Sequence, residues 1–179
     1  MVTVKNLETI NPVSVKEIGE DKILQEVDII KQVLQDYPHF ESAGTILGLY
    51  RDKHLIPHDS DYDIEILDKG YDYDKLNTIL VNNGLRLIRI MHHNNRFMQL
   101  AYRMKCGFIF DIYIYYKEHG KWKNYNDYGI LVHNKDNLPT SNIEGYLELR
   151  YGKDWQTPKS KKESWENDAG LALIRWELL

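Results

Sequence analysis

Four acidic residues at alternate positions constrain this chain more than any other feature. They are Asp59, Asp61, Asp63 and Glu65, in the stretch GTILGLYRDKHLIPHDSDYDIEI at residues 44–66. Polar and apolar residues alternate in DYDIEIL, which predicts a half-buried strand with Asp61, Asp63 and Glu65 on one face. Their charges repel, and burying an unpaired carboxylate costs on the order of several kcal/mol. Such a row is therefore either a solvated face or a site where cations, bases or substrate neutralise it.

Another carboxylate, Asp111, lies inside the apolar run GFIFDIYIYY. Mg²⁺ prefers oxygen ligands from a few carboxylates together with substrate phosphates. Asp61 and Asp63 would project in parallel toward one ion, and Asp111 from a second strand would complete a site for two ions. The Gly44-Thr45 turn opens a short helix, whose free N-terminal amides suit a phosphate. Together these residues predict a nucleotide-phosphate site.

The remaining pattern predicts an α+β (α/β-type) fold with a small mixed sheet flanked by helices. We expect one domain over residues 1–179, with an N-terminal extension at 1–20. The expected helices cover residues 21–37, a short segment from Thr45 to before Pro57, 74–82, 142–151 with a Ser141 or Asn142 cap, and a closing helix within 160–179. The expected strands lie at 61–67, 85–91, 96–102 and 107–116, with a hairpin turn at 92–95 and a loop-rich stretch around Trp122 and Tyr125.

Composition excludes several classes of protein. The net charge is -4 over 179 residues, and Lys and Arg are dispersed, which argues against a protein that grips duplex nucleic acid. The single cysteine, Cys106, excludes an intrachain disulfide framework and favours a reducing, cytoplasmic location. We expect no transmembrane segment, because no run reaches roughly 18 to 20 apolar residues.

The spacing of these motifs resembles one branch of the nucleotidyltransferase superfamily, the LicD and fukutin-related family. That family has Gly-Thr-Leu-Leu-Gly, an Arg, and Ile-Pro-Trp-Asp-x-Asp-x-Asp. A second segment, LELRYGKDWQTP at 147–158, is similar to the late Tyr-Gly-x-x-Trp/Tyr-x-x-Pro element of the branch. His58 stands where the family prefers Trp. The matching positions in the first motif are Gly44, Thr45, Leu47, Gly48, Arg51, Ile56, Pro57, Asp59, Asp61 and Asp63.

The resemblance implies a nucleotidyltransferase-like fold and roles for individual residues. Asp61 and Asp63 would ligate Mg²⁺ or Mn²⁺, and Asp59 would lie at the edge of the site. Asp111 would ligate metal or act as the base for the acceptor proton.

On the substrate side, the resemblance implies that Gly44 and Thr45 hold donor phosphate. Arg51 would neutralise charge on the transferring phosphoryl group, or else pair with a local carboxylate such as Asp52.

The reaction implied is transfer of a phospho-alcohol, such as phosphocholine or phosphoribitol, from a CDP-activated donor to a glycan or small hydroxyl acceptor. Two alternatives remain open from the sequence. The same site could move a nucleoside monophosphate from an NTP to a small molecule or protein, or the chain could be a non-catalytic nucleotide-binding module.

Overall fold

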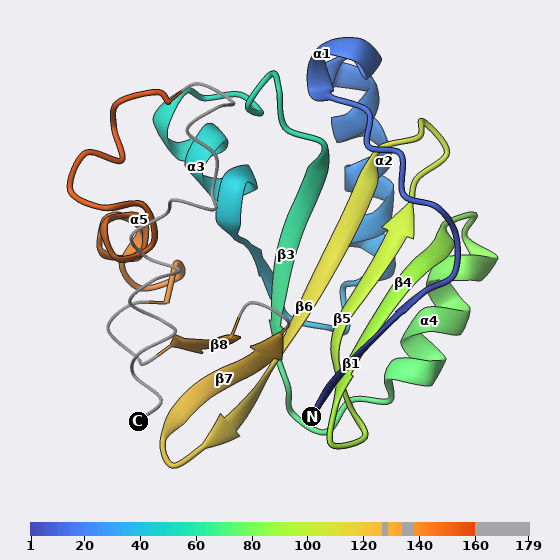
Figure 1. The fold of residues 1–179 in the computed structure, drawn as a ribbon. Coiled ribbons are helices and arrows are strands. Elements are labelled where there is room, and N and C mark those ends of the chain that lie inside the picture. Colours follow the sequence, from blue (N-terminus) through green and yellow to red (C-terminus); the bar gives the residue numbers. More distant parts are fainter. Residues whose placement is uncertain (127–128, 134–137, 160–179) are drawn as a thin grey trace.

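The computed structural model describes residues 1–126, 129–133 and 138–159 (Figure 1). The closing helix expected within 160–179 falls outside these residues. In chain order the elements are β1 (Val2–Asn6), α1 (Val15–Ile18), α2 (Glu20–Val33), β2 (His39–Glu41), α3 (Ala43–Arg51), β3 (Asp61–Leu67), α4 (Tyr73–Asn82), β4 (Arg86–His93), β5 (Arg96–Arg103), β6 (Ile109–Glu118), β7 (Lys121–Asn126), β8 (Gly129–His133) and α5 (Ile143–Tyr151).

One mixed sheet organises the fold. Its strands lie in the order β1-β4-β5-β6-β3-β2, and β7 pairs with the end of β6 and with β8. The β3–β6 pair is parallel, whereas the other pairs are antiparallel. The predicted α+β class, a mixed sheet flanked by helices, is confirmed.

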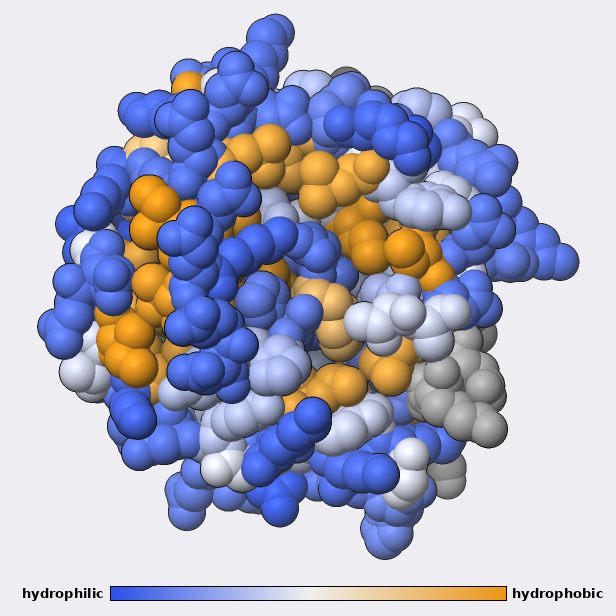
Figure 2. All heavy atoms as spheres, turned by 180° about the vertical axis from the view of Figure 1, so that it is seen from behind, coloured by the Kyte–Doolittle hydropathy of each residue, from blue (hydrophilic) through white to orange (hydrophobic). Residues whose placement is uncertain are grey.

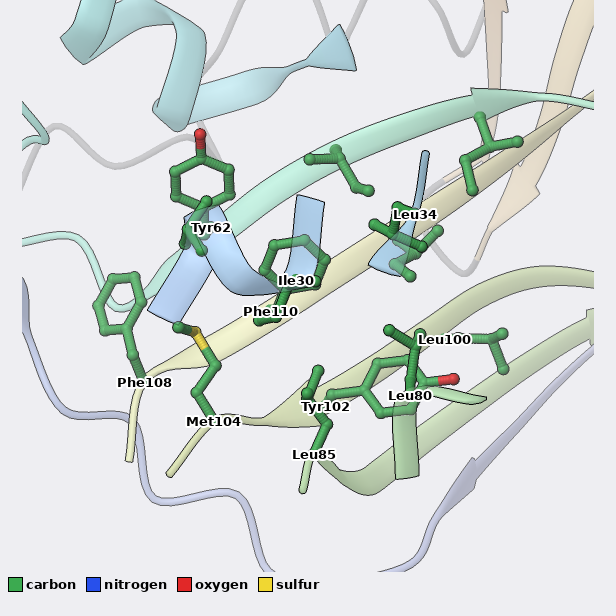
Figure 3. Packing of buried hydrophobic residues seen from close by; sticks show 14 of the residues in the cluster. Ile30, Leu34, Tyr62, Leu80, Leu85, Leu100, Tyr102, Met104, Phe108 and Phe110 are labelled. Carbon is green, nitrogen blue, oxygen red and sulfur yellow. The ribbon is translucent and has the colours of Figure 1, made fainter. Parts of the chain in front are cut away.

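The main core lies between the sheet and helices α2 and α4. Tyr62 and Phe110, from neighbouring strands, stack with ring centroids 5.7 Å apart, and Ile30 and Leu34 of the α2 segment pack near them (Figure 3). Because side chains alternate along β3, turning Tyr62 into this core turns Asp61 and the other acidic residues to the opposite face. The outer surface seen from behind is mostly hydrophilic, with apolar patches between the polar side chains (Figure 2).

A smaller apolar cluster joins α3 to α5. It contains Ile46 and Leu47 from α3, Tyr146 and Leu147 from α5, and Trp155 from the turn that follows. The Asn142 side chain accepts a hydrogen bond from the Gly145 amide and so caps α5, as one of the two caps expected from the sequence. The two motifs quoted above, far apart in the sequence, are thus packed against each other beside the acidic face.

The stretch around Trp122 and Tyr125 was expected to be a loop, and this expectation is wrong. Residues 121–126 form β7, which pairs with β6 and β8. The segment KWKNYN has little apolar alternation of its own, and its pairing depends on tertiary contacts. The buried side-chain amide of Asn124 donates hydrogen bonds to the backbone carbonyls of Met98 and Ile114, which fixes β7 against the sheet.

Smaller differences occur at several other places. Helix α2 ends at Val33, four residues short of the expected end at residue 37. Helix α3 begins at Ala43 rather than Thr45. The hairpin turn is confined to Asn94 and Asn95, both in the left-handed region, so the two histidines before them belong to β4. The first twenty residues contribute β1, which extends the sheet by pairing with β4.

Candidate active site

Three predicted carboxylates meet on the acidic face. Asp61 and Asp63 come from β3 and Asp111 from β6, and the parallel register places Asp63 directly opposite Asp111. One carboxylate oxygen from each residue lies within 4.8 Å of those of the other two. Asp63 and Asp111 are buried and Asp61 is half-buried. The alternation seen in the sequence turns these side chains to one face, and the parallel pairing of β3 with β6 brings them together.

Burial raises the pKa of each carboxyl group in this cluster. The pKa of Asp111 rises to about 7, chiefly because the group is buried and secondly because Asp61 is near. The pKa of Asp63 is raised well above its usual range by burial and then by the charges of Asp61, Asp111 and Asp59. The folded chain therefore holds several carboxylates in a place that disfavours their negative charge.

A divalent cation fits this cluster. The Oδ1 atom of Asp111 is buried and has no hydrogen-bond partner among the described residues. Hard ions such as Mg²⁺ and Mn²⁺ bind carboxylate oxygens, and an ion would offset both the burial and the mutual repulsion of these negative charges. Asp61, Asp63 and Asp111 are the residues that would hold it.

Asp59 lies just before β3, at the edge of the cluster. Its Oδ1 accepts a hydrogen bond from the Ser60 amide at 3.0 Å. Its pKa is raised well above the usual value by burial and by the neighbouring Asp61. Gly44 packs against it so closely that a Cβ at residue 44 would lie 2.4 Å from Asp59 Oδ2. A glycine at this position therefore leaves room for the Asp59 carboxylate.

Thr45 holds α3 to the acidic strand. The Asp63 amide donates a 2.8 Å hydrogen bond to Thr45 Oγ1, and Thr45 is only 1% exposed. Just before it, Ser42 donates its amide to the Asp63 carbonyl at 3.1 Å, at the point where β2 ends. Thr45 thus supplies the acceptor that a longer β2 would have provided, and it fixes the backbone of Asp63.

The start of α3 is held in an unusual conformation. Ala43 has φ 47, in the left-handed region, and its amide donates to the buried Tyr146 hydroxyl at 3.0 Å. The Ser42 hydroxyl is buried without a partner among the described residues. Tyr146 on α5 therefore fixes the conformation of the turn that contains Gly44.

The guanidinium of Arg51 is engaged elsewhere. Its Nε and Nη2 donate to the two oxygens of Asp52 at 2.8 and 2.6 Å, and Nη1 donates to the Trp155 carbonyl at 3.3 Å. This is the local pairing that the sequence left open as an alternative. Arg51 links α3 to the turn after α5.

The sequence alone did not single out two arginines near the carboxylates. The Nη2 atom of Arg89 on β4 lies 3.8 Å from Asp111 Oδ2. Arg150 on α5, within the late motif, lies close enough to oppose the rise in the Asp63 pKa. Neither arginine lies near the acidic motif in the sequence, and β4 is three strands from β3 in the sheet. No local signal marks them, because strand register and helix packing decide where they lie.

Glu65 is buried, which excludes the solvated position that the sequence allowed for it. It is 1% exposed. The Tyr115 hydroxyl donates to its Oε1 at 3.2 Å, and His133 Nε2 lies 2.7 Å from its Oε2. Glu65 thus anchors β8 to the acidic face.

The architecture and the carboxylate cluster together define a nucleotidyltransferase-like domain. A family model described as "LicD/FKTN/FKRP, nucleotidyltransferase domain" matches residues 36–153. The chain belongs to this family, and this membership indicates a transferase of the nucleotidyl- or phosphotransferase type.

Other comparisons add less. A solved structure, the lincosamide antibiotic adenylyltransferase LnuA bound to lincomycin, aligns over 71% of this chain and 73% of its own, with 17% identity and a TM-score of 0.46. The comparison with curated proteins found no match. Within the described ranges, no helix is long and apolar enough to cross a membrane.

Proposed function

We propose that this protein is a divalent-metal-dependent transferase. It moves a phospho-alcohol, such as phosphocholine or phosphoribitol, from a CDP-activated donor to a hydroxyl group of a glycan or small acceptor. The observation that carries the proposal is the cluster of Asp61, Asp63 and Asp111, with ligand oxygens within 4.8 Å, in a chain of the LicD family.

In this reaction an acceptor oxygen bonds to the phosphorus that carries the alcohol. The bond from that phosphorus to the oxygen bridging it to CMP breaks, and CMP leaves with the electron pair. Mg²⁺ or Mn²⁺ would supply charge stabilisation for the attacking and leaving oxygens. Asp111, the carboxylate on the second strand, is proposed to ligate the ion or to take the acceptor proton.

The donor phosphate is proposed to lie at the start of α3. Across the described residues, no hydrogen bond engages the amides of Gly44 and Thr45, and the Ser42 hydroxyl beside them has no partner. Free first-turn amides and a hydroxyl are suited to phosphate oxygens. Asp59 borders the same place through its contact with Gly44 and would limit how the donor enters.

Thermal stabilisation by a panel of donors tests the proposal. CDP-choline, CDP-ribitol and CDP-glycerol are compared with the four NTPs, each with Mg²⁺ or Mn²⁺. Binding to the folded state at a hundredfold excess over Kd adds about 2.7 kcal/mol of stability. We expect metal-dependent stabilisation by one CDP-alcohol, and loss of this effect in Asp61→Asn/Asp63→Asn. Asp74→Asn, an exposed carboxylate on α4, is the matched control.

The other outcomes point to the two alternatives. A preference for an NTP would indicate nucleotidyl transfer with pyrophosphate as the leaving group. A protein that responds to no nucleotide with either metal would contradict catalysis at this site and would favour the non-catalytic module.

A further inference from the structure

Two of the three carboxylates, Asp63 and Asp111, share one transverse row of the sheet with Arg89. The register places Arg89 of β4 opposite Ala101 of β5, Ala101 opposite Asp111 of β6, and Asp111 opposite Asp63 of β3. Directly paired residues project from the same face of a sheet. Because Ala101 carries only a methyl group, the long Arg89 side chain can cross β5 and approach Asp111 to 3.8 Å.

A β-bulge turns Arg89 toward this face. The pairing of β4 with β5 skips one residue, Ile88, between Leu87 and Arg89. In a regular strand, Arg89 would lie on the same face as Leu87, which packs against the main core. The extra residue moves Arg89 to the face of the carboxylates, and bulges commonly re-aim side chains next to active sites.

Unpaired polar atoms gather beside Arg89. In the part of the chain that the structure describes, Arg89 Nε and both polar side-chain atoms of Gln99 are buried without a hydrogen-bond partner of ordinary length. Gln99 lies close enough to Asp111 to lower the pKa of that carboxyl group, although burial outweighs this effect. Gln99 is 0% exposed and lies two residues before Ala101 on β5, on the same face. The 3.8 Å separation from Asp111 exceeds hydrogen-bond length, so the Arg89 guanidinium is not used in a bidentate pair with that carboxylate.

Nearly all buried donors in folded proteins are satisfied, so donors left without a partner call for one, such as a water molecule, an ion or a ligand. The donors here are a guanidinium fork and an amide, a combination that suits the oxygens of a phosphoryl group. Arg51, the cation expected from the family motif, already uses its fork on Asp52. Arg89 is therefore the better placed of these two arginines to meet a phosphoryl group at the carboxylates.

We infer that Arg89 and Gln99 form an anion subsite that binds the transferring phosphoryl group. The inference rests on the proposed function, in which this group is the β-phosphate of a CDP-activated donor. Arg89 and Gln99 donate to its non-bridging oxygens, which carry the charge in the transition state of phosphoryl transfer. The α-phosphate, which stays with CMP, lies outside this subsite.

Calorimetric titration with CDP and CMP in the presence of Mn²⁺ tests the subsite, because CDP has the β-phosphate and CMP lacks it. We expect Arg89→Gln to weaken the affinity for CDP roughly ten- to a hundredfold, while the affinity for CMP changes less than about threefold. Gln99→Met should have a smaller effect in the same direction. Arg86→Gln is the matched control, since Arg86 lies on the same strand but pairs with Glu8 at 2.8 Å.

Binding of Mn²⁺ alone separates a substrate contact from a role in holding Asp111. Removing a cation should leave Mn²⁺ affinity unchanged or higher in Arg89→Gln. The inference would be overturned if Arg89→Gln lost affinity for Mn²⁺ and for CDP in parallel. It would also be overturned if this variant lost affinity for CDP and CMP equally, or if its affinity for both nucleotides were unchanged. Should Arg89→Gln fail to fold, Arg89→Lys retains the charge without the fork and should still weaken CDP selectively. If the wild-type protein binds neither nucleotide, the proposed function itself fails.

Discussion

Replacing Thr45 by Val should both destabilise the protein and disturb the carboxylate cluster. Valine has nearly the shape of threonine but lacks Oγ1, the acceptor of the 2.8 Å hydrogen bond from the Asp63 amide. Because Thr45 is 1% exposed, water cannot easily replace this acceptor. A buried amide left without a partner costs about 1 to 3 kcal/mol. For a chain of this size, that loss lowers Tm by roughly 3 to 10 °C.

Thr45→Ser is the matched control, because it retains the hydroxyl and removes only a methyl group, at a cost of about 1 kcal/mol. Urea unfolding with and without Mn²⁺ measures both effects. We expect Thr45→Val to be the less stable variant and to gain less stability from Mn²⁺, since the backbone of Asp63 is no longer fixed. A Val variant as stable as the Ser variant, with the full response to Mn²⁺, would refute this account of Thr45.

Three further outcomes are expected. Metal-free protein should lose stability as the pH rises from about 4 to 7. The reason is that Asp111 has a pKa of about 7 in the folded protein against 3.8 for the ordinary group, so in this pH range it keeps a proton that the unfolded chain has released. The free energy of unfolding then falls by up to about 1.4 kcal/mol per pH unit for each such proton. Mn²⁺ should stabilise more at pH 7.5 than at pH 5.5, and Asp111→Asn should flatten the pH dependence in thermal melts. Tyr146→Phe should cost about 1 to 3 kcal/mol in urea unfolding, because it leaves the Ala43 amide unpaired; an unchanged midpoint would contradict that role. Asn95→Gly should raise the stability by a few tenths to about 1 kcal/mol, because the Asn94-Asn95 turn has φ of 49 and 62, whereas lower stability would argue against a left-handed turn.

Much of the sheet could be predicted because its signals are local. Period-two alternation located β3 and β6 and predicted the faces of both strands. The Asn142 cap and Gly152 marked the ends of α5 in the same way, through residues that act within one turn. Strand β7 could not be predicted, because nothing in KWKNYN itself requires an extended conformation. The segment is held by the side-chain amide of Asn124, which donates hydrogen bonds to carbonyls of two other strands.

In the candidate site, too, some positions follow from local sequence signals and others depend on tertiary contacts. Asp61 and Asp63 lie two residues apart on one strand, so their common direction follows from the strand alone. Asp111 joins them through the parallel pairing of β3 with β6. Its charge inside an apolar run marked it as a candidate, but the spacing of residues does not show which strand lies beside it. Glu65 has the same parity as the pair, yet Tyr115 and His133 remove it from solvent. The alternation along a strand therefore predicts which face a carboxylate projects from. Whether that carboxylate remains available to a ligand depends on the side chains that bind it in the folded protein.

The positive charges show why a motif can identify a family and still leave the chemistry open. Arg51 falls within the motif, but Asp52 follows it directly in the chain and takes both ends of its guanidinium fork. Arg89 falls outside the motif and reaches the carboxylates only because one extra residue in β4 changes its face. Without this bulge, with Ile88 paired in register, Arg89 would share the face of Leu87 in the core, where an unpaired cation is costly. The position of Arg89 thus depends on a β-bulge in β4, a feature that hydrophobic periodicity does not predict.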